Sequence, residues 1–242
     1  MNASIIGPDR LQIKLFSDGA DLVDMQRLAN LPYIKGLTTN PTLMTQAGIN
    51  NYENFAKEVL LFLKEKPISF EVFSDEFDDM ERQANKIAGW GDNIYVKIPV
   101  TNTQGVSSAA LVKRLASNVV KLNVTAILTL EQVNTIHDAL SPDTPAIVSV
   151  FAGRVADTGR DPIPIMSAAK TLLADQPKTE LLWASPREVL NIIQADQSGC
   201  DIITATPDIL KKLSKLDYDL ERFSLDTVRM FYDDAKKAKY TL

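Results

Sequence analysis

The amino-acid sequence predicts an α/β fold, a single-domain (β/α)8 or TIM barrel. Eight short runs rich in β-branched residues alternate with longer amphipathic stretches along 242 residues, which is the length and rhythm of such a barrel. The competing prediction is an open, doubly wound sheet, but no glycine-rich turn of the dinucleotide or P-loop type follows any of the runs. No linker rich in Pro, Gly or Ser divides the chain, so we expect one domain over residues 1–242.

The eight runs are the expected strands, and the stretches between them are the expected helices. Apolar residues recur at helical spacing in residues 51–66, 75–90 and 107–120. The last stretch, about 223–239, predicts an extra helix that closes the bottom of the barrel or packs on a neighbouring subunit. The strands are expected at 12–17, 33–38, 68–73, 94–98, 122–127, 145–150, 180–184 and 201–204.

The composition is that of an ordinary globular protein and excludes several classes of function. The chain is 45% hydrophobic with a net charge of -5 and no cluster of Lys and Arg, so we expect no nucleic-acid partner. Cys200 is the single cysteine, and no run of about 18 apolar residues predicts a membrane span. Residues 1–10 lack the pattern of a signal peptide, so we expect a cytoplasmic protein. No His, Cys or carboxylate spacing predicts a metal site.

Lys97 is the most informative residue, because it interrupts an apolar run, NIYVKIPV at residues 93–100, that predicts a buried strand. A buried, unpaired ammonium group is costly, so this lysine must be paired, uncharged or used for chemistry. A purely structural ion pair with Glu71 is the alternative. Buried ion pairs rarely stabilise a protein more than an apolar pair of the same size, which favours the chemical interpretation.

The alternation of side chains along each strand predicts which residues point into the barrel. If Lys97 points inward, Val96 and Ile98 face the helices, and Ala126 on the next strand does so too. Barrels of this kind place catalytic residues at the C-terminal ends of their strands. The side chains expected there, pointing inward, are Asp18, Asn40, Glu71, Asn123, Thr125, Ser149, Phe151, Trp183 and Ser185.

These residue types favour aldol chemistry on a phosphorylated sugar. A lysine in an apolar pocket can form a Schiff base with a ketone or aldehyde. Asp18 and Glu71 can move protons, and Thr125 can position a water. Arg154 and Arg187 follow strands six and seven at the mouth and, with Ser185, suit a phosphate.

Several of these residues also have structural interpretations. Asp18 or Asn40 could cap the helix that follows it, and the two arginines could pair with Asp157 or Glu188 on the surface. His137, the only histidine, is expected to be solvated on an outer helix without a functional role.

The motifs of the chain resemble those of the transaldolase family, and more narrowly its short-chain members and the related fructose 6-phosphate aldolases. They occur in family order across almost the whole chain. The matching segments are SDGAD at 17–21, GLTTNPTL at 36–43, FEV at 70–72, VKIPVT at 96–101, LNVTAI at 122–127, SVFAGR at 149–154 and ASPR at 184–187.

The resemblance implies a role for each of these residues. Lys97 would be the Schiff-base lysine, Asp18 the acid and base, and Glu71 and Thr125 the holders of a catalytic water. The resemblance further implies that the sugar chain is bound by Asn40, Asn123 and Ser149, and the phosphate by Arg154, Ser185 and Arg187.

Glu71 and Phe151 match the transaldolases, whereas the fructose 6-phosphate aldolases typically carry Gln and Tyr at these two positions. The resemblance therefore implies a transaldolase of the pentose phosphate pathway. It would need no cofactor and no metal, bind phosphorylated sugars, and form a homo-oligomer. The alternatives are a fructose 6-phosphate aldolase that releases dihydroxyacetone and a non-catalytic barrel that binds phosphosugars.

Overall fold

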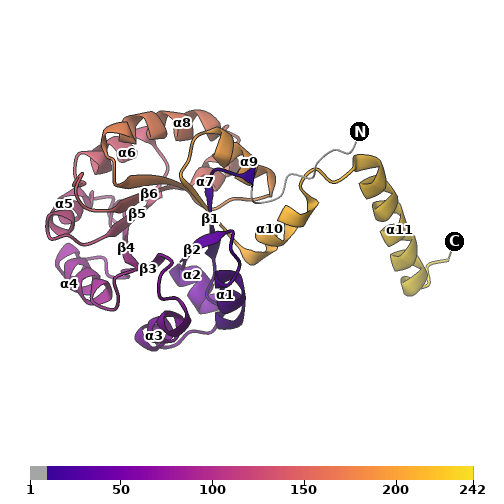
Figure 1. The fold of residues 1–242 in the computed structure, drawn as a ribbon, viewed down its shortest axis with the longest axis horizontal. Coiled ribbons are helices and arrows are strands. Elements are labelled where there is room, and N and C mark those ends of the chain that lie inside the picture. Colours follow the sequence, from indigo (N-terminus) through magenta and orange to yellow (C-terminus); the bar gives the residue numbers. More distant parts are fainter. Residues whose placement is uncertain (1–9, 242) are drawn as a thin grey trace.

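The computed structural model describes residues 10–241, and these form a closed barrel of eight parallel strands surrounded by helices (Figure 1). The predicted fold class is confirmed. Each strand pairs with its neighbours in chain order, and β8 closes the ring by pairing with β1. The strands are β1 (Lys14–Asp18), β2 (Ile34–Thr38), β3 (Ile68–Glu71), β4 (Ile94–Pro99), β5 (Leu122–Ile127), β6 (Ala146–Val150), β7 (Thr179–Trp183) and β8 (Ile202–Ala205).

The helices lie outside the barrel, and one or more follow each strand in the chain. The prediction made from residues 1–10 falls almost wholly outside the described residues. The helices are α1 (Leu22–Ala29), α2 (Pro41–Gln46), α3 (Tyr52–Phe62), α4 (Phe77–Ala88), α5 (Ala109–Ser117), α6 (Leu130–His137), α7 (Ala152–Asp157), α8 (Ile163–Leu172), α9 (Leu190–Gln197), α10 (Pro207–Lys211) and α11 (Leu220–Ala238), with short 3-10 turns η2 (Leu173–Asp175) and η3 (Lys212–Lys215).

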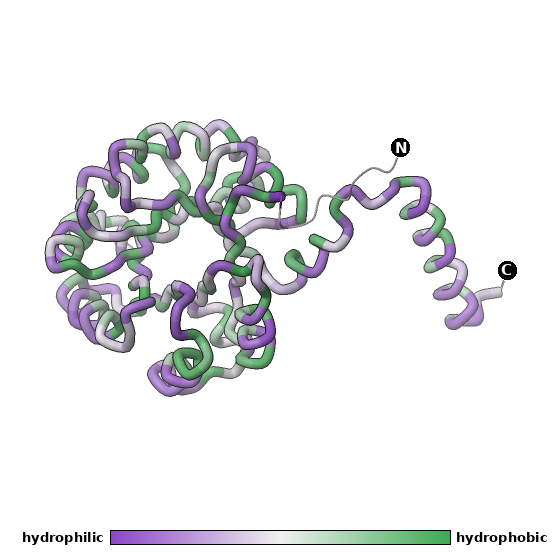
Figure 2. The backbone as a smooth tube through the Cα atoms, viewed as in Figure 1, coloured by the Kyte–Doolittle hydropathy of each residue, from purple (hydrophilic) through white to green (hydrophobic). Residues whose placement is uncertain are grey.

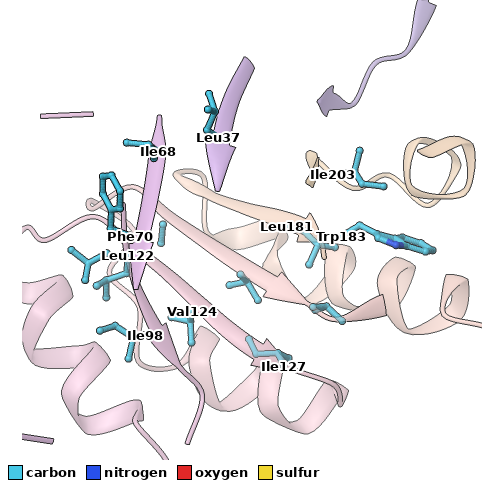
Figure 3. Packing of buried hydrophobic residues seen from close by; sticks show 14 of the residues in the cluster. Leu37, Ile68, Phe70, Ile98, Leu122, Val124, Ile127, Leu181, Trp183 and Ile203 are labelled. Carbon is cyan, nitrogen blue, oxygen red and sulfur yellow. The ribbon is translucent and has the colours of Figure 1, made fainter. Parts of the chain in front are cut away.

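The main hydrophobic core lies between the strands and the surrounding helices. Figure 3 shows Phe70, Ile98 and Val124 projecting from their strands into this layer, where all three are fully buried. Burial of these apolar surfaces is the main force that keeps the helices on the barrel. Because these residues face outward, their neighbours Glu71, Lys97 and Thr125 face the barrel interior.

The prediction that Trp183 points into the barrel is wrong. Its side chain belongs to the outer core, whereas Leu182 and Ala184 belong to the apolar cluster inside the barrel. The register explains this, because Leu182 pairs with Ser149 of β6 and therefore shares its inward direction. Ser185 has a φ of 61°, so the strand alternation cannot be counted back from it.

The prediction that Ala126 faces the helices is also wrong. Ala126 has a φ of 61°, and the pairing of β5 with β6 shifts between Val124 and Ile127. An irregularity of this kind turns two successive side chains toward the same side of a sheet. Thr125 and Ala126 accordingly both line the cavity at the C-terminal end of the barrel.

The opposite end of the barrel is filled by apolar side chains and carries an ion pair. The ring of Phe16 occupies the space above Gly36, where any side chain would collide with it. Lys14, which also points inward, donates to Glu180 at 2.5 Å. β1 begins at Lys14, two residues later than predicted, so Gln12 lies outside the strand.

α11 stands clear of the barrel, and none of its residues is buried (Figures 1 and 2). It begins three residues before the predicted position and carries apolar side chains that its own barrel does not cover. Among the described helices, none is both long and apolar enough to cross a membrane.

His137 is not simply solvated, which corrects the prediction. It ends α6, and its two ring nitrogens lie 2.9 Å from Asp138 and 2.8 Å from Asp175 of the 3-10 turn after α8. Hydrogen bonds to these two carboxylates raise the pKa of His137 above its ordinary value. In its protonated form, His137 therefore joins α6 to the turn that leads into β7.

We expect the contribution of His137 to stability to fall as pH rises. A raised pKa in the folded state means that the stabilisation is complete below the ordinary histidine pKa and disappears as pH rises through the folded value. The His137→Gln variant should therefore lose more thermal stability at about pH 6 than at about pH 9. Because the chain has one histidine, its single NMR signal reports the titration directly, and a midpoint at or below the ordinary value would contradict the prediction.

Candidate active site

The C-terminal ends of the strands surround a cavity of about 480 Å3. It is the expected location for a site in a barrel of this type. The sequence-predicted residues that line it are Asp18, Asn40, Glu71, Lys97, Thr125, Ser149, Phe151, Arg154, Ser185 and Arg187. Asn123 is fully buried behind this lining, and Trp183 lies on the far side of its strand.

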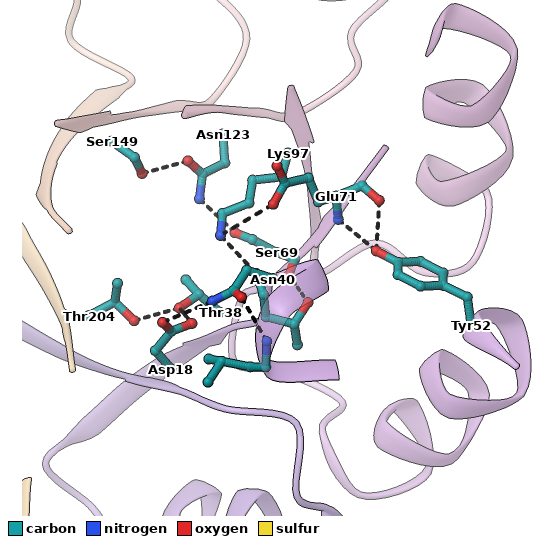
Figure 4. A network of polar contacts seen from close by, with 12 residues as sticks. Asp18, Thr38, Asn40, Tyr52, Ser69, Glu71, Lys97, Asn123, Ser149 and Thr204 are labelled. Carbon is teal, nitrogen blue, oxygen red and sulfur yellow. Dashed lines mark hydrogen bonds and ion pairs between the residues drawn. The ribbon is translucent and has the colours of Figure 1, made fainter. Parts of the chain in front are cut away.

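Lys97 lies at the base of this cavity and is 6% exposed. Its Nζ donates a hydrogen bond of 2.7 Å to the carbonyl oxygen of Thr39, and it lies 4.0 Å from Oε2 of Glu71 (Figure 4). The amine is thus held by one backbone acceptor and one carboxylate.

Two side chains at the C-terminal end of β2 hold Asp18 in the cavity. Thr38 donates to Oδ1 at 2.8 Å, and Asn40 donates to Oδ2 at 3.3 Å. Burial raises the pKa of Asp18, although the charge of Lys97 and these two hydrogen bonds act against the rise. Asp18 does not cap α1, because the side chain of Asp21 accepts the capping hydrogen bond.

Glu71 is the second carboxylate of the cavity. Burial raises its pKa, the nearby Lys97 lowers it, and the charge of Asp18 raises it further, with a net rise. Two carboxylates with raised pKa values beside one amine are suited to exchanging protons closer to neutral pH than an exposed carboxylate would.

A chain of buried hydrogen bonds supports the wall beside Lys97. Ser149 donates to Asn123 at 2.6 Å, and Asn123 donates to Ser69 at 2.9 Å. Asn123 pairs directly with Lys97 in the β4–β5 ladder. This chain fixes the amide of Asn123, whose side chain the sequence predicts to bind substrate.

Thr125 supplies an unused polar group in the cavity wall. Its Oγ1 is buried and has no hydrogen-bond partner among the described residues. Buried hydroxyl groups are normally paired, so an unpaired one that lines a cavity is suited to holding a water or a substrate oxygen.

The two arginines stand at the exposed mouth. Arg154 lies over the ring of Phe151, 5.3 Å from its centre, and Arg187 forms a bidentate ion pair with Asp157. Gly153 allows α7 to approach the backbone of Ser185 closely, because a side chain at position 153 would overlap the carbonyl oxygen of Ser185. The sequence allows either a surface ion pair with Asp157 or a place at the cavity for Arg187. In the structure, Arg187 both makes that ion pair and lines the cavity.

The sequence reasoning missed several polar residues of the site. Thr38 joins Asp18 to Thr204 of β8, with 2.5 Å between the two hydroxyl oxygens. Tyr52 contacts the backbone of Glu71 from α3. The inward alternation of β2 and β8 could have revealed the two threonines, but no sequence signal singles out Tyr52.

Comparison with known proteins agrees with this geometry. The family described as "Transaldolase/Fructose-6-phosphate aldolase" matches residues 15–242. The chain belongs to this family. The description of this family and the names of the chain's relatives support an enzyme of transaldolase or aldolase type.

Individual relatives cover nearly the whole chain. The chain is 33% identical over 221 residues to a protein of Thermoplasma volcanium named "Probable transaldolase", covering 88% of this chain and 95% of the relative. It is 30% identical over 230 residues to a protein of the same name from Nitrosopumilus maritimus, covering 94% and 96%. The crystal structure of 2,3-dimethylmalate lyase is similar in fold alone, with a TM-score of 0.54, 10% identity and coverage of 96% and 86%.

We expect the Glu71→Gln variant to be more heat-stable than the parent above neutral pH. Because the folded pKa of Glu71 is raised, folding disfavours its carboxylate, and this penalty operates at high pH and vanishes as pH falls below the ordinary value. A neutral amide of the same shape removes the penalty, so the melting temperature should rise by a few degrees at about pH 8. The gain should shrink toward about pH 5. Thermal unfolding at both pH values tests this, and a loss of stability at the higher pH would contradict it.

Proposed function

We propose that the protein is a transaldolase that transfers a dihydroxyacetone unit between phosphorylated sugars through a Schiff base on Lys97. The observation that carries the proposal is the buried Lys97 amine, 4.0 Å from Glu71, at the base of a cavity that also contains Asp18. The family of the chain supports the same chemistry. The substrates we propose are those of the pentose phosphate pathway.

The first half-reaction cleaves a ketose phosphate such as fructose 6-phosphate. The amine of Lys97 adds to the ketone carbon, and loss of one water gives the imine. Glu71, with a water held by Thr125, moves the protons of this dehydration. Asp18 then accepts the proton of the hydroxyl group on C4, two carbons from the imine carbon C2. The bond between C3 and C4 breaks, and glyceraldehyde 3-phosphate leaves. Dihydroxyacetone stays on Lys97 as an enamine.

The second half-reaction reverses these steps with another aldehyde. The enamine carbon attacks the aldehyde of erythrose 4-phosphate, and Asp18 returns its proton to the new hydroxyl group. Hydrolysis of the imine consumes the water released earlier, frees the amine and gives sedoheptulose 7-phosphate. The imine itself accepts the electron pair of the broken bond, so the two half-reactions balance without an added oxidant or reductant.

The mouth arginines are suited to the phosphate of each sugar. Arg187 uses Nε and one Nη group on Asp157, which leaves its other Nη group directed away from that pair. Arg154 and the hydroxyl group of Ser185 line the same mouth. Guanidinium groups bind phosphate oxygens strongly because they donate in a fixed planar geometry.

A fructose 6-phosphate aldolase is the second candidate, because the family includes that activity. The two differ in whether water or a sugar aldehyde removes the enamine. Phe151 lines the cavity and has no hydroxyl group with which to help a water protonate the enamine. This favours transfer over release.

We expect fructose 6-phosphate and borohydride to attach one reduced dihydroxyacetone unit to Lys97. Intact-protein mass and peptide mapping measure the adduct, which should be absent from Lys97→Arg. The matched control is Lys66→Arg, which changes a partly buried amine that bonds backbone carbonyls outside the cavity. Adduct on another lysine, or none while the sugar still binds, would contradict the proposal. Rapid accumulation of glyceraldehyde 3-phosphate without an acceptor would instead indicate an aldolase.

We also propose that α11 packs on a second copy of the chain. Phe223, Val228 and Phe231 are at least 40% exposed on its apolar side. The chain itself offers a receptor, an apolar groove between α1 and α3 where Val23 and Leu61 are 76% and 74% exposed. Glu58 borders this groove and is opposite in charge to Lys236 and Lys237 in the last turn of α11. Such a contact is isologous where two copies exchange their helices, and it is heterologous where each copy passes its helix to the next one around a ring.

We expect the protein to be oligomeric and each of two charge substitutions to dissociate it. Phe231→Glu places a carboxylate on the apolar side of α11, and Leu61→Glu places one in the groove. The control is Asp233→Asn on the polar side of the same helix. Light scattering gives the mass of each species. A monomeric parent, or a Phe231→Glu variant with the mass of the parent, would refute this proposal. Dissociation of Phe231→Glu but not of Leu61→Glu would refute the groove as the surface that receives α11.

A further inference from the structure

The hydrogen-bond ladder between β2 and β3 stops one bond earlier than its geometry allows. The N–H of Thr39 donates to the carbonyl of Ser69 at 3.2 Å. In a parallel ladder, the next bond would run from the N–H of Glu71 to the carbonyl of Thr39. That bond is missing, because both groups have other partners.

Tyr52 takes the place of β2 as the partner of Glu71. The N–H of Glu71 donates to the Tyr52 hydroxyl group at 2.7 Å, and the hydroxyl group donates to the carbonyl of Glu71 at 2.8 Å (Figure 4). One side chain thus satisfies both backbone groups of the last residue of β3. The carbonyl of Thr39 is left to accept the 2.7 Å hydrogen bond from Lys97.

The ring of Tyr52 is held firmly enough for this role. It packs against Phe70, Phe73 and Trp90, with ring centres 6.1, 5.5 and 5.9 Å away. Burial raises the pKa of its hydroxyl group above the ordinary value, so the proton stays on the oxygen that donates to Glu71. α3 brings the ring to this point, since Tyr52 is its first residue.

We propose that Tyr52 is a positioning residue that keeps Glu71 and Lys97 in their reactive places. Its hydroxyl group occupies the N–H of Glu71, and the carbonyl of Thr39 therefore remains available to the amine. Without the hydroxyl group, the N–H of Glu71 would turn toward Thr39, compete with the amine and draw the Glu71 carboxylate toward β2. This inference rests on the proposed Schiff-base function and adds a residue that contacts neither substrate nor the reacting atoms.

The test is the Tyr52→Phe variant, which keeps the ring and removes the hydroxyl group. We expect kcat to fall about 10-fold, with KM changed less than about twofold, because binding groups at the mouth are untouched. The rate of borohydride trapping on Lys97 should fall by a similar factor. The matched control is Tyr218→Phe, which loses one hydrogen bond of 2.8 Å to Asp226, remote from the cavity, and should keep parental kinetics.

A second variant protects the test against a folding defect. Phe73 is 66% exposed, so Phe73→Leu should fold normally, but it removes one of the ring contacts that hold Tyr52 in place. It should lower kcat in the same direction by a smaller factor. Parental kcat in both variants, with or without a lower melting temperature, would overturn the inference and leave Tyr52 with a structural role. Absence of any Lys97 adduct in the parent enzyme would overturn the proposed function itself.

Discussion

The hydrogen bond from Lys97 to the carbonyl of Thr39 is the contact on which the rest of the site depends. A buried amine needs an acceptor, and a carbonyl within a continuous ladder would already be occupied. Thr39 offers one because Tyr52 takes the N–H of Glu71 and the chain turns at once into α2, which Asn40 caps. The end of one strand therefore fixes the position of the Lys97 nitrogen on another.

The two carboxylates near this amine are held at a cost to stability. Burial raises the pKa of both Asp18 and Glu71, which means that folding disfavours their ionised forms. The outer core offsets this cost, since residues such as Phe70 and Val96 are fully buried against the helices. Stability and reactivity are thus divided between the two faces of the same strands, as in other enzymes with strained or desolvated sites.

The sequence predicted the barrel and most of the cavity because both depend on short-range alternation. Lys97 between Val96 and Ile98 shows its direction without any knowledge of neighbouring strands. Alternation failed at Trp183 and Ala126, where backbone irregularities with positive φ at Ser185 and Ala126 change which side a residue faces. Positions of this kind are rare for residues other than glycine, and nothing in their local sequence marks them.

The contribution of Tyr52 could not be predicted for a different reason. Its hydroxyl group matters because it takes the N–H of Glu71, which would otherwise extend the β2–β3 ladder beyond the bond between Thr39 and Ser69. The sequence around Tyr52 indicates an amphipathic helix, and that prediction is right, since it begins α3. A residue can thus fit its local pattern fully and still act on a distant strand.

The distribution of charge in the cavity favours one orientation of any phosphorylated substrate. Asp18 and Glu71 at the base repel a phosphate group, whereas Arg154 and Arg187 at the mouth attract it. Both arginines are already held by protein partners, Phe151 and Asp157, so little side-chain freedom remains to be lost on binding. A sugar phosphate would therefore enter with its phosphate outward and its carbonyl carbon toward Lys97. In the proposed reaction, orientation of this kind would supply a large part of the catalysis, because it would make the attack of the amine effectively unimolecular.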